Sequence, residues 1–432
     1  MNSKLLSFGL IMSLLAQSCN AQNAPTPNIS EKEVARIIKT LSADDMKGRN
    51  SLKPTEIAKA ADFIAAEFKL AGLSYFKDAK SYRQNFRLSN VVPIGGRLTI
   101  NGKSIANDDY IVSSPKEKLE MQSAPRLFKI SKDDDFFAKY QEISHSKTDL
   151  LVQIDEHLRP SFNRLKAYLN QGNMSIGQKE SPTIVYLLSN QEVVGFKLSF
   201  TNKVNSVPMF NVLGVLPGKS KPNEYVIFSG HYDHLGVIKS VDKDSIANGA
   251  DDDASGTTAV IALAKYFAQQ KNNERTLLFV AFTAEEIGGY GSQYFSKQLD
   301  PNKVVAMFNI EMIGKQSKFG KHNAFITGFE HSNFGEILQQ NLQGTPFKFY
   351  PDPYPKENLF YRSDNATLAM LGVPAHTISS DQIDTDKLYH SVDDEFETLD
   401  VTNITEIIKA IAISSGSIVS GKDTPSRVLG VK

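Results

Sequence analysis

The stretch "ASGTTAVIALAKYFAQQKNNERTLLFVAFTA" (254–284) predicts a helix that is followed closely by a buried strand. In its first half, apolar residues from Val260 to Phe267 recur at helical spacing, which gives a helix with one buried face. The second half contains "TLLFVAFTA" (276–284), an almost continuously apolar run. Such runs are typical of strands that are covered on both faces of a sheet.

The same alternation continues on both sides of this stretch. The predicted strands are "EYVIFSG" (224–230), "VVAMFNIEMI" (304–313), "NAFITGF" (323–329) and "PAHTIS" (374–379), and the further helices are "GSQYFSKQL" (291–299), "FGEILQQNLQ" (334–343) and "NITEIIKAIAISSG" (403–416). The pattern predicts an α/β fold of three αβα layers, with a mostly parallel central sheet and helices on both faces. In such a sheet the ligand site lies at the carboxyl ends of the strands.

Polar residues that can carry chemistry stand where these strands end. They are His231, Tyr232, Asp233 and His234; Glu285 and Glu286; Glu311; and Tyr389 with His390. The triplet Asp251 to Asp253 precedes the first helix, and three adjacent anions are tolerable only if they are solvated or if a cation lies among them. Each feature alone has an ordinary structural explanation, but their recurrence at the strand ends of one sheet favours a shared site.

The residue types in this set indicate zinc, which prefers imidazole and carboxylate ligands. The candidates are too many for one catalytic zinc ion that keeps an open position. They predict two ions, about 3.5–4 Å apart, that share a bridging carboxylate and a bridging water. A nearby carboxylate that binds no metal could act as the general base, so the predicted reaction is amide hydrolysis without a protein nucleophile.

Five segments resemble the M28 family of co-catalytic zinc exopeptidases, which includes bacterial leucyl aminopeptidases and glutamate carboxypeptidases. They are "SGHYDHLG", "NGADDDASGTTAV", "FTAEEIGGYGS", "FNIEMIG" and "LYHSVDD", in this order and with comparable gaps. The resemblance covers roughly residues 208–415. A weaker similarity is "LSADDMKGRNS" (41–51), which resembles the lead-in of many secreted members.

The resemblance implies a role for each residue that matches a motif. It implies that His231, Asp252, Glu286, Glu311 and His390 bind metal, with Asp252 as the bridging ligand. It implies further that Glu285 is the general base. Asp233 would fix the tautomer of His231, and Asp251 and Asp253 would support the bridge, with a cis peptide bond after Asp252. Tyr389 resembles the tyrosine that helps to hold the developing oxyanion in carboxypeptidase-type relatives.

The chain departs from the family pattern at two of these positions. Glu311 stands where many relatives have aspartate, and "Ser363, Asp364, Asn365" replaces the usual Ser-Asp-His. Arg362 could bind a substrate carboxylate or lie on the surface. Four other histidines are assigned to structure or to solvent contact, although His234 is close enough to line the site; they are His234, His322, His331 and His376.

The chain of 432 residues is long enough for a main domain with an inserted one. We expect an amino-terminal helical part of the peptidase domain at 30–94, in which Ser30 and Glu33 form a capping box. A small inserted α/β or β-rich domain follows at 95–205, and the catalytic di-zinc domain lies at 206–425. The 48 basic and 48 acidic residues balance, and no long basic run is present, so nucleic acid is excluded as a partner.

Residues 1–21 have the pattern of a secretory signal, with Lys4 before the apolar run "LLSFGLIMSLLA" (5–16). Cys19 resembles the lipidation site of a bacterial lipoprotein, and cleavage after Ala21 is the alternative. We therefore expect export to the periplasm, the outer membrane or the cell surface, with membrane contact only through a lipid anchor at Cys19. Since Cys19 is the only cysteine, disulfides do not stabilise the protein.

Four functions remain open from the sequence. A di-zinc aminopeptidase that acts on peptides is favoured, and a carboxypeptidase of the same family is the first alternative. A glutaminyl cyclase shares the fold but uses one zinc ion. A receptor or binding module on the same fold would have lost its ligands, whereas the set here is complete.

Overall fold

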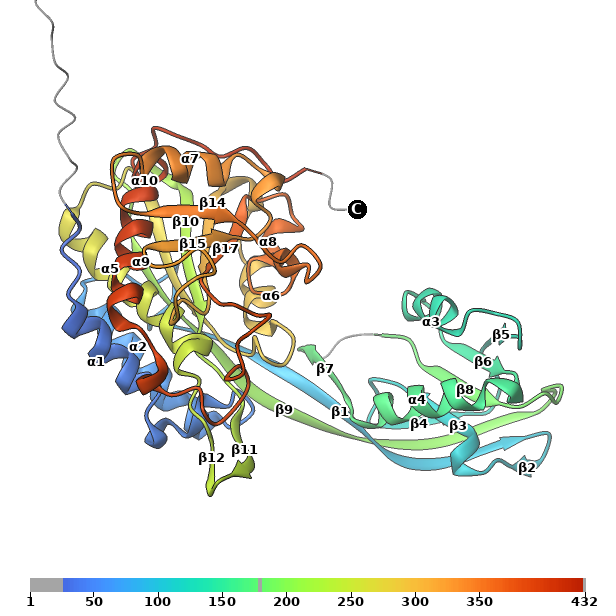
Figure 1. Cartoon of the computed structure of the whole chain (residues 1–432). Helices are drawn as coiled ribbons and strands as arrows, with labels where there is room; N and C mark the ends of the chain where they lie inside the picture. Colours follow the sequence, from blue (N-terminus) through green and yellow to red (C-terminus); the bar gives the residue numbers. More distant parts are fainter. Residues whose placement is uncertain (1–25, 178–180, 430–432) are drawn as a thin grey trace, which may run out of the picture.

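The computed structural model describes residues 26–177 and 181–429, which form a layered α/β body and an elongated arm (Figure 1). In the body, helices cover both faces of a large mixed sheet. The predicted three-layer α/β fold is therefore confirmed. The predicted signal at 1–21, with Cys19, lies outside the described residues.

Parallel strands form the middle of the body's sheet. From one side to the other they are β13 (Arg275–Phe282), β10 (Lys221–His231), β14 (Val304–Ile310) and β17 (Ala375–Ser379), each parallel to its neighbour. Beyond β17 lie the antiparallel β15 (Asn323–Ile326) and then β16 (Lys348–Pro351), whereas β9 (Phe196–Leu216) flanks β13 on the other side and runs antiparallel to it. The carboxyl ends of the four parallel strands consequently meet at one edge.

Side chains along these strands alternate between two hydrophobic cores. On β13, Phe279 packs into the core of one face and Val280 into the core of the other, and both are fully buried. The first face is covered by α1 (Glu31–Leu41), α2 (Pro54–Leu70), α5 (Gly256–Gln270), α7 (Phe334–Asn341), α9 (Val401–Ser414) and α10 (Gly416–Val419), and the second by α6 (Tyr290–Ser296) and α8 (Ala366–Ala369). Burial on both faces explains why the strands are apolar at consecutive positions.

The amino-terminal helices form as expected, but only half of the capping box does. The Ser30 hydroxyl accepts a hydrogen bond from the Glu33 amide at 3.4 Å and so caps α1. The Glu33 carboxylate does not return to the Ser30 amide, because it pairs with Arg36 at 2.7 Å and with Lys265 at 2.5 Å. The pair with Lys265 connects α1 to α5, in place of the second half of the box.

A long antiparallel ribbon carries the arm away from the body (Figure 1). Strand β1 (Arg83–Ile100) pairs with β9 from Arg83↔Val212 to Ile100↔Phe196, so both strands belong to the body at one end and to the arm at the other. The remaining elements of the arm are β2 (Lys103–Ser104), β3 (Tyr110–Ser113), β4 (Lys118–Met121), β5 (Arg126–Ile130), α3 (Phe136–Ser144), β6 (Leu150–Ile154), α4 (Arg159–Asn170), β7 (Asn173–Ile176) and β8 (Ile184–Leu188). They include a separate sheet in the order β3-β8-β6-β5. We propose that the inserted unit spans 95–205, with the ribbon shared between it and the body.

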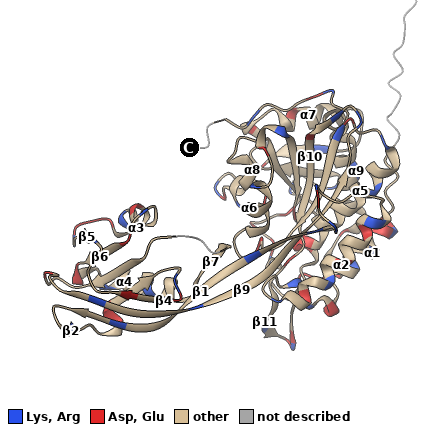
Figure 2. Cartoon of the chain, turned by 180° about the vertical axis from the view of Figure 1, so that it is seen from behind, with Lys and Arg blue, Asp and Glu red and all other residues tan. Residues whose placement is uncertain are grey.

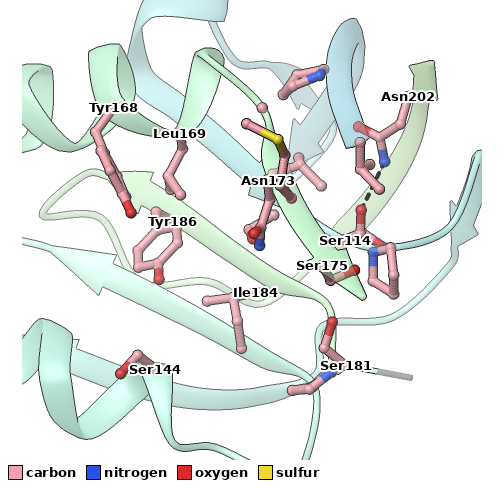
Figure 3. A pocket seen from close by; sticks show the side chains of 18 of the residues that line it. Ser114, Ser144, Tyr168, Leu169, Asn173, Ser175, Ser181, Ile184, Tyr186 and Asn202 are labelled. Atoms are coloured by element: carbon pink, nitrogen blue, oxygen red, sulfur yellow. Dashed lines mark hydrogen bonds between the residues drawn. The ribbon is translucent and has the colours of Figure 1, made fainter. Parts of the chain in front are cut away.

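The arm contains a cavity of about 230 Å³ between the ribbon, β7 and the separate sheet (Figure 3). Its described walls carry hydroxyl and amide groups together with aromatic rings, such as Ser114, Asn173, Tyr168 and Tyr186, and no charged side chain. None of these wall residues belongs to the set predicted at the strand ends of the body.

The surface shows no dominant charge. Figure 2 shows acidic and basic positions interspersed along α1 and α2, in line with equal totals of 48 each. Across 26–177 and 181–429, the structure contains no helix with both the length and the apolar character to cross a bilayer. One short hairpin, β11 (Gly236–Val241) and β12 (Asp244–Ala247), was not predicted and lies between β10 and the acidic triplet.

His376 predicts a pH dependence of stability. Its ring is fully buried on β17, stacks on Phe334, and contacts the Ser332 hydroxyl through Nε2 at 2.7 Å and the Thr327 carbonyl through Nδ1 at 2.9 Å. Burial lowers its pKa from 6.5 to about 4. Between pH 6.5 and 4 the imidazole is protonated in the unfolded chain but neutral in the folded chain. The free energy of unfolding therefore falls by about 3 kcal/mol as the pH drops from 6.5 to 4.

Urea unfolding of His376→Asn, compared with the unaltered chain across this range, tests the prediction. Asparagine keeps a donor for the Thr327 carbonyl and removes the titrating group. The stability of the variant should fall less steeply on acidification, and identical profiles would contradict the assignment.

Candidate metal centre

The residues predicted at the strand ends lie together at the carboxyl edge of the sheet. His231 ends β10, Glu285 and Glu286 follow β13, and Glu311 follows β14. Because these three strands are parallel neighbours, their ends bring the side chains together from distant parts of the chain. The turn Ala250–Ser255 and the loop that holds His390 complete the arrangement.

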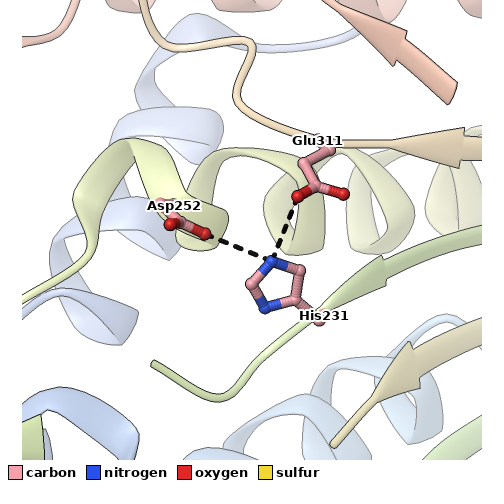
Figure 4. A group of neighbouring side chains, drawn as sticks. All are labelled: His231, Asp252 and Glu311. Carbon is pink, nitrogen blue, oxygen red and sulfur yellow. Dashed lines mark ion pairs between the residues drawn. The ribbon is translucent and has the colours of Figure 1, made fainter. Parts of the chain in front are cut away.

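One group of ligand atoms surrounds His231 (Figure 4). Its Nε2 atom lies 3.2 Å from Asp252 Oδ1 and 3.6 Å from Glu311 Oε1. The ring is buried, and Nε2 forms no hydrogen bond with any described residue. A buried nitrogen without a partner, facing two carboxylates, is the arrangement expected of a metal ligand.

A second group surrounds His390 and shares Asp252 with the first. The Nε2 atom of His390 lies 3.3 Å from Asp252 Oδ2 and 3.1 Å from Glu286 Oε2. Asp252 therefore turns one carboxylate oxygen toward each imidazole. This is the arrangement that a bridging ligand requires.

The spacing within both groups fits zinc. Ligand bonds of about 2.0–2.2 Å in a tetrahedron place neighbouring ligand atoms about 3.3–3.6 Å apart. The four distances around His231 and His390 range from 3.1 to 3.6 Å. The residues present thus fit two ions, one held by His231, Asp252 and Glu311, and the other by His390, Asp252 and Glu286.

The two neighbours of Asp252 turn away from these groups and bind backbone amides. Asp253 accepts hydrogen bonds from the amides of His231 at 3.1 Å and Met312 at 3.1 Å, and Asp251 accepts one from the Gly314 amide at 2.6 Å. They therefore connect the triplet to the ends of β10 and β14, in agreement with a supporting role. The Asp252–Asp253 peptide bond is cis, as the resemblance implies.

The neighbouring histidines favour the ionised form of the Asp252 carboxylate. Burial opposes its ionisation, but His234, His231 and His390 together hold its pKa well below the ordinary value. Asp253 lies deeper and beside other carboxylates, and burial raises its pKa well above the ordinary value. Asp252, the carboxylate common to both groups, is thus the ionised member of the pair.

Asp233 differs in detail from its expected role. The group nearest to His231 Nδ1 is the Asp233 backbone carbonyl, at 3.1 Å, whereas the Asp233 carboxylate is 3.9 Å away. That carboxylate instead accepts a hydrogen bond from the Glu285 amide at 3.1 Å. The residue therefore orients His231 through its main chain and the Glu285 segment through its side chain.

Glu285 lies beside the two groups in a strained segment. Burial and the neighbouring carboxylates of Glu311 and Asp364 raise its pKa well above the ordinary value, although His231 opposes this. The preceding residue, Ala284, has a φ of 59°, and His390 itself has a φ of 57°. Positive φ values cost an ordinary residue about 1–3 kcal/mol and persist where the surroundings impose them, often at functional sites.

Tyr389 and Arg362 line a small cavity next to Glu311. The Tyr389 ring is 39% exposed and stacks on His390 at 3.8 Å. The Arg362 side chain is half-exposed and lies 3.4 Å from Glu357. Ser363, which precedes the departure from the family pattern at Asn365, donates a hydrogen bond to Glu311 Oε2, whereas Oε1 is the oxygen that faces His231.

A third acidic cluster lies close to the triplet. It consists of Asp251, Asp381 and Asp386. The Lys315 ammonium group is 2.5 Å from Asp386 Oδ2 and 3.4 Å from Asp251 Oδ2. A cation of the chain already neutralises this cluster, and we assign it to structure.

Two residues that support the centre were missed from the sequence. Arg49 is fully buried and donates hydrogen bonds to the carbonyls of Tyr232, Asn248 and Gly249 at 2.6–2.8 Å. Asp394 accepts hydrogen bonds from the amides of Asp251 and Asp252 at 2.9 and 3.0 Å. Both act on backbone groups, for which local sequence offers no signal. Asp394 does lie within the quoted motif "LYHSVDD".

We expect Arg49→Met to destabilise the protein by about 3 kcal/mol or more, because several buried carbonyls lose their donor and each costs about 1–3 kcal/mol. Urea unfolding of the metal-free protein measures this loss. The control is Arg126→Met on β5, which removes an exposed arginine and should change stability by about 0.5 kcal/mol or less. Equal losses in the two variants would refute the role of Arg49.

Comparison with known proteins gives a consistent result. Residues 211–414 match the family described as Peptidase family M28. A "probable zinc metalloprotease" of Leptosphaeria maculans is 29% identical over 143 residues, which are 33% of this chain and 32% of that protein. Leucine aminopeptidase 1 of Paracoccidioides brasiliensis is 28% identical over 220 residues, 48% of this chain and 54% of that protein. The chain thus spans between about a third and about half of the length of these two relatives.

The fold is also found among solved structures. A zinc aminopeptidase from Bacillus subtilis superposes with a TM-score of 0.55 at 17% sequence identity, covering 95% of this chain and 100% of that one. At this level of identity the likeness concerns the fold.

Proposed function

We propose, on the premise that residues 211–414 match Peptidase family M28, that the protein is an exported di-zinc exopeptidase that removes amino-terminal residues from peptides. The observation that carries the proposal is Asp252, whose two oxygens lie 3.2 and 3.3 Å from the imidazoles of His231 and His390. This geometry supports two ions with a shared carboxylate. A single-zinc cyclase would need only one of the two groups.

Each residue has a proposed task toward the metal. His231, Asp252 and Glu311 would hold one zinc ion, and His390, Asp252 and Glu286 the other. When bound, paired ions of this kind polarise a carbonyl group and lower the pKa of water. The chain supplies the fixed positions: Ser363 orients Glu311, and Arg49 and Asp394 fix the backbone that carries Asp252.

Glu285 is the proposed general base. It is partly buried, it contributes to neither of the two ligand groups, and its segment is held by the Asp233 carboxylate. A carboxylate whose pKa is raised can accept a proton from the attacking water and pass it to the leaving amine. Tyr389 is the proposed oxyanion donor, since its ring lies against His390 and lines the cavity beside Glu311.

The surroundings favour an amino terminus over a carboxyl terminus in the substrate. The cavity of about 80 Å³ beside Glu311 has apolar walls that include Met312, Phe325 and Leu359. Its acidic wall residues are Glu311 and Asp381, and among the described lining residues the only cation is Arg362 at the outer side, next to Glu357. Because Arg362 pairs with Glu357, this cavity offers no free cation among its described lining residues to hold a substrate carboxylate, which favours the amino terminus.

Export is proposed from the sequence pattern at 1–21, with lipidation at Cys19 or cleavage after Ala21 as its two forms. The proposed location is the periplasm, the outer membrane or the cell surface. The proposed substrates are peptides that reach this space.

The test is incubation of the zinc-loaded protein with a mixed peptide library, followed by mass spectrometry. We expect stepwise loss of single amino-terminal residues and no loss from the same peptides after amino-terminal acetylation. Trimming from the carboxyl end would establish the carboxypeptidase alternative. Cyclisation of amino-terminal glutamine without cleavage would establish the cyclase, and no product at all would favour the binding module.

A further inference from the structure

His234 lies directly beside the candidate metal centre, where the sequence allowed it to line the site but assigned it no chemical task. Its ring is fully buried and meets the His390 ring edge-on, with centroids 5.8 Å apart. On its other side lies Gly249, where an added Cβ would come within 2.6 Å of the ring. A glycine at 249 therefore makes room for the imidazole and holds it in one place.

The distance from His234 to Glu286 differs from the distances between the proposed ligands. His234 Nδ1 is 2.7 Å from Glu286 Oε1. Atoms that bind one zinc ion are about 3.3–3.6 Å apart, so 2.7 Å is too short for two ligands of one ion and typical of a charge-assisted hydrogen bond. The other oxygen, Oε2, is the one that faces His390 at 3.1 Å.

The second nitrogen of His234 identifies the tautomer. Nε2 is buried and forms no hydrogen bond within the described part of the chain. A proton on Nε2 would leave a buried donor without a partner, whereas a proton on Nδ1 is donated to Glu286.

We propose that His234 is a positioning residue: it donates Nδ1–H to Glu286 Oε1 and thereby presents Oε2 to the zinc ion that is shared with His390. The inference rests on the proposed di-zinc function. It assigns to His234 a part in the affinity of the His390 site, because the two carboxylate oxygens near His234 Nδ1, Glu286 Oε1 at 2.7 Å and Asp252 Oδ2 at 3.8 Å, belong to the side chains that face His390.

Substituting His234 with asparagine or glutamine distinguishes a hydrogen-bonding role from a role in packing alone. Asparagine places its amide nitrogen where histidine has Nδ1, and glutamine places it where histidine has Nε2. We expect His234→Asn to keep the affinity of both zinc sites within about threefold. His234→Gln and His234→Ala should weaken one site 10–100-fold, the range for loss of a partner of a metal ligand, and leave the other unchanged.

The measurement is competition with a chelator, which yields a dissociation constant for each zinc site. Circular dichroism of the metal-free variants checks that they fold, and His376→Asn is the matched control at a buried histidine away from the centre. The inference is overturned if His234→Ala keeps both affinities. It is also overturned if His234→Asn binds zinc as weakly as His234→Ala does. That result would indicate that His234 is itself a metal ligand. An unaltered protein that binds only one zinc ion would instead refute the di-zinc proposal.

Discussion

Replacing Glu285 with glutamine is expected to lower kcat by about 10²–10⁴-fold, the usual contribution of a general base, while two zinc ions stay bound. Glutamine has nearly the same shape as glutamate but cannot accept the proton of the attacking water. The ligand groups around His231 and His390 do not include Glu285, so metal affinity should not change. Steady-state kinetics on a leucine anilide, with zinc analysis of the same sample, measures both quantities.

Two further variants sharpen this test. Glu285→Asp keeps a carboxylate one methylene shorter, so it should retain more activity than Glu285→Gln. Glu336→Gln on α7 changes an exposed glutamate and should leave kcat unaffected. Full activity of Glu285→Gln would show that another group accepts the proton.

Asp252→Asn is expected to abolish activity by removing zinc from both sites. Both imidazoles face this carboxylate, one across each oxygen. Loss of a mere partner of a ligand weakens a zinc site about 10–100-fold, so loss of the shared ligand should weaken each site by more than about 100-fold. Chelator competition should find that both dissociation constants rise together.

Matched control variants distinguish loss of a ligand shared by both sites from loss of a single negative charge. Glu311→Gln should weaken only the site of His231. Asp133→Asn alters the chain's other run of three aspartates, in the arm, and should change neither site. If Asp252→Asn lost a single ion, the carboxylate would be an ordinary ligand and the two groups would be independent.

The order of strands and helices between 221 and 414 could be predicted because burial on both faces leaves a simple pattern. Continuous apolar runs mark β10, β13 and β14, and helical spacing marks α5. His231, Glu285, Glu286 and Glu311 could be predicted to lie together because parallel strands place their ends at one edge, whereas the roles of Asp252 and His390 came from the family resemblance.

Contacts between distant backbone segments could not be predicted. Arg49 binds the Tyr232 carbonyl 183 positions away, and a lone arginine in "KGRNS" carries no sign of that partner. For His234, the sequence predicted a place close to the site. Its hydrogen bond to Glu286 could not be predicted, because that contact depends on the path of the chain after β10. The Asp233 carboxylate shows the same limit, because it lies nearer to the Glu285 amide than to the imidazole it was expected to orient.

The fold of the arm could not be predicted, because its two longest strands are far apart in the sequence. Strands β1 and β9 are separated by about a hundred residues, and each leaves the body to become part of the arm. Their pairing depends on contacts that no short window of sequence contains. The short strands between them alternate only weakly, so the sequence supported an inserted domain but not its path.

The most direct test of the two-ion centre is a crystal structure of the zinc-loaded protein with anomalous data at the zinc edge. The account predicts two peaks, about 3.5–4 Å apart, on either side of the Asp252 carboxylate. His231 and Glu311 should contact one peak, and His390 and Glu286 the other. A single peak, or two peaks that do not share Asp252, would contradict it.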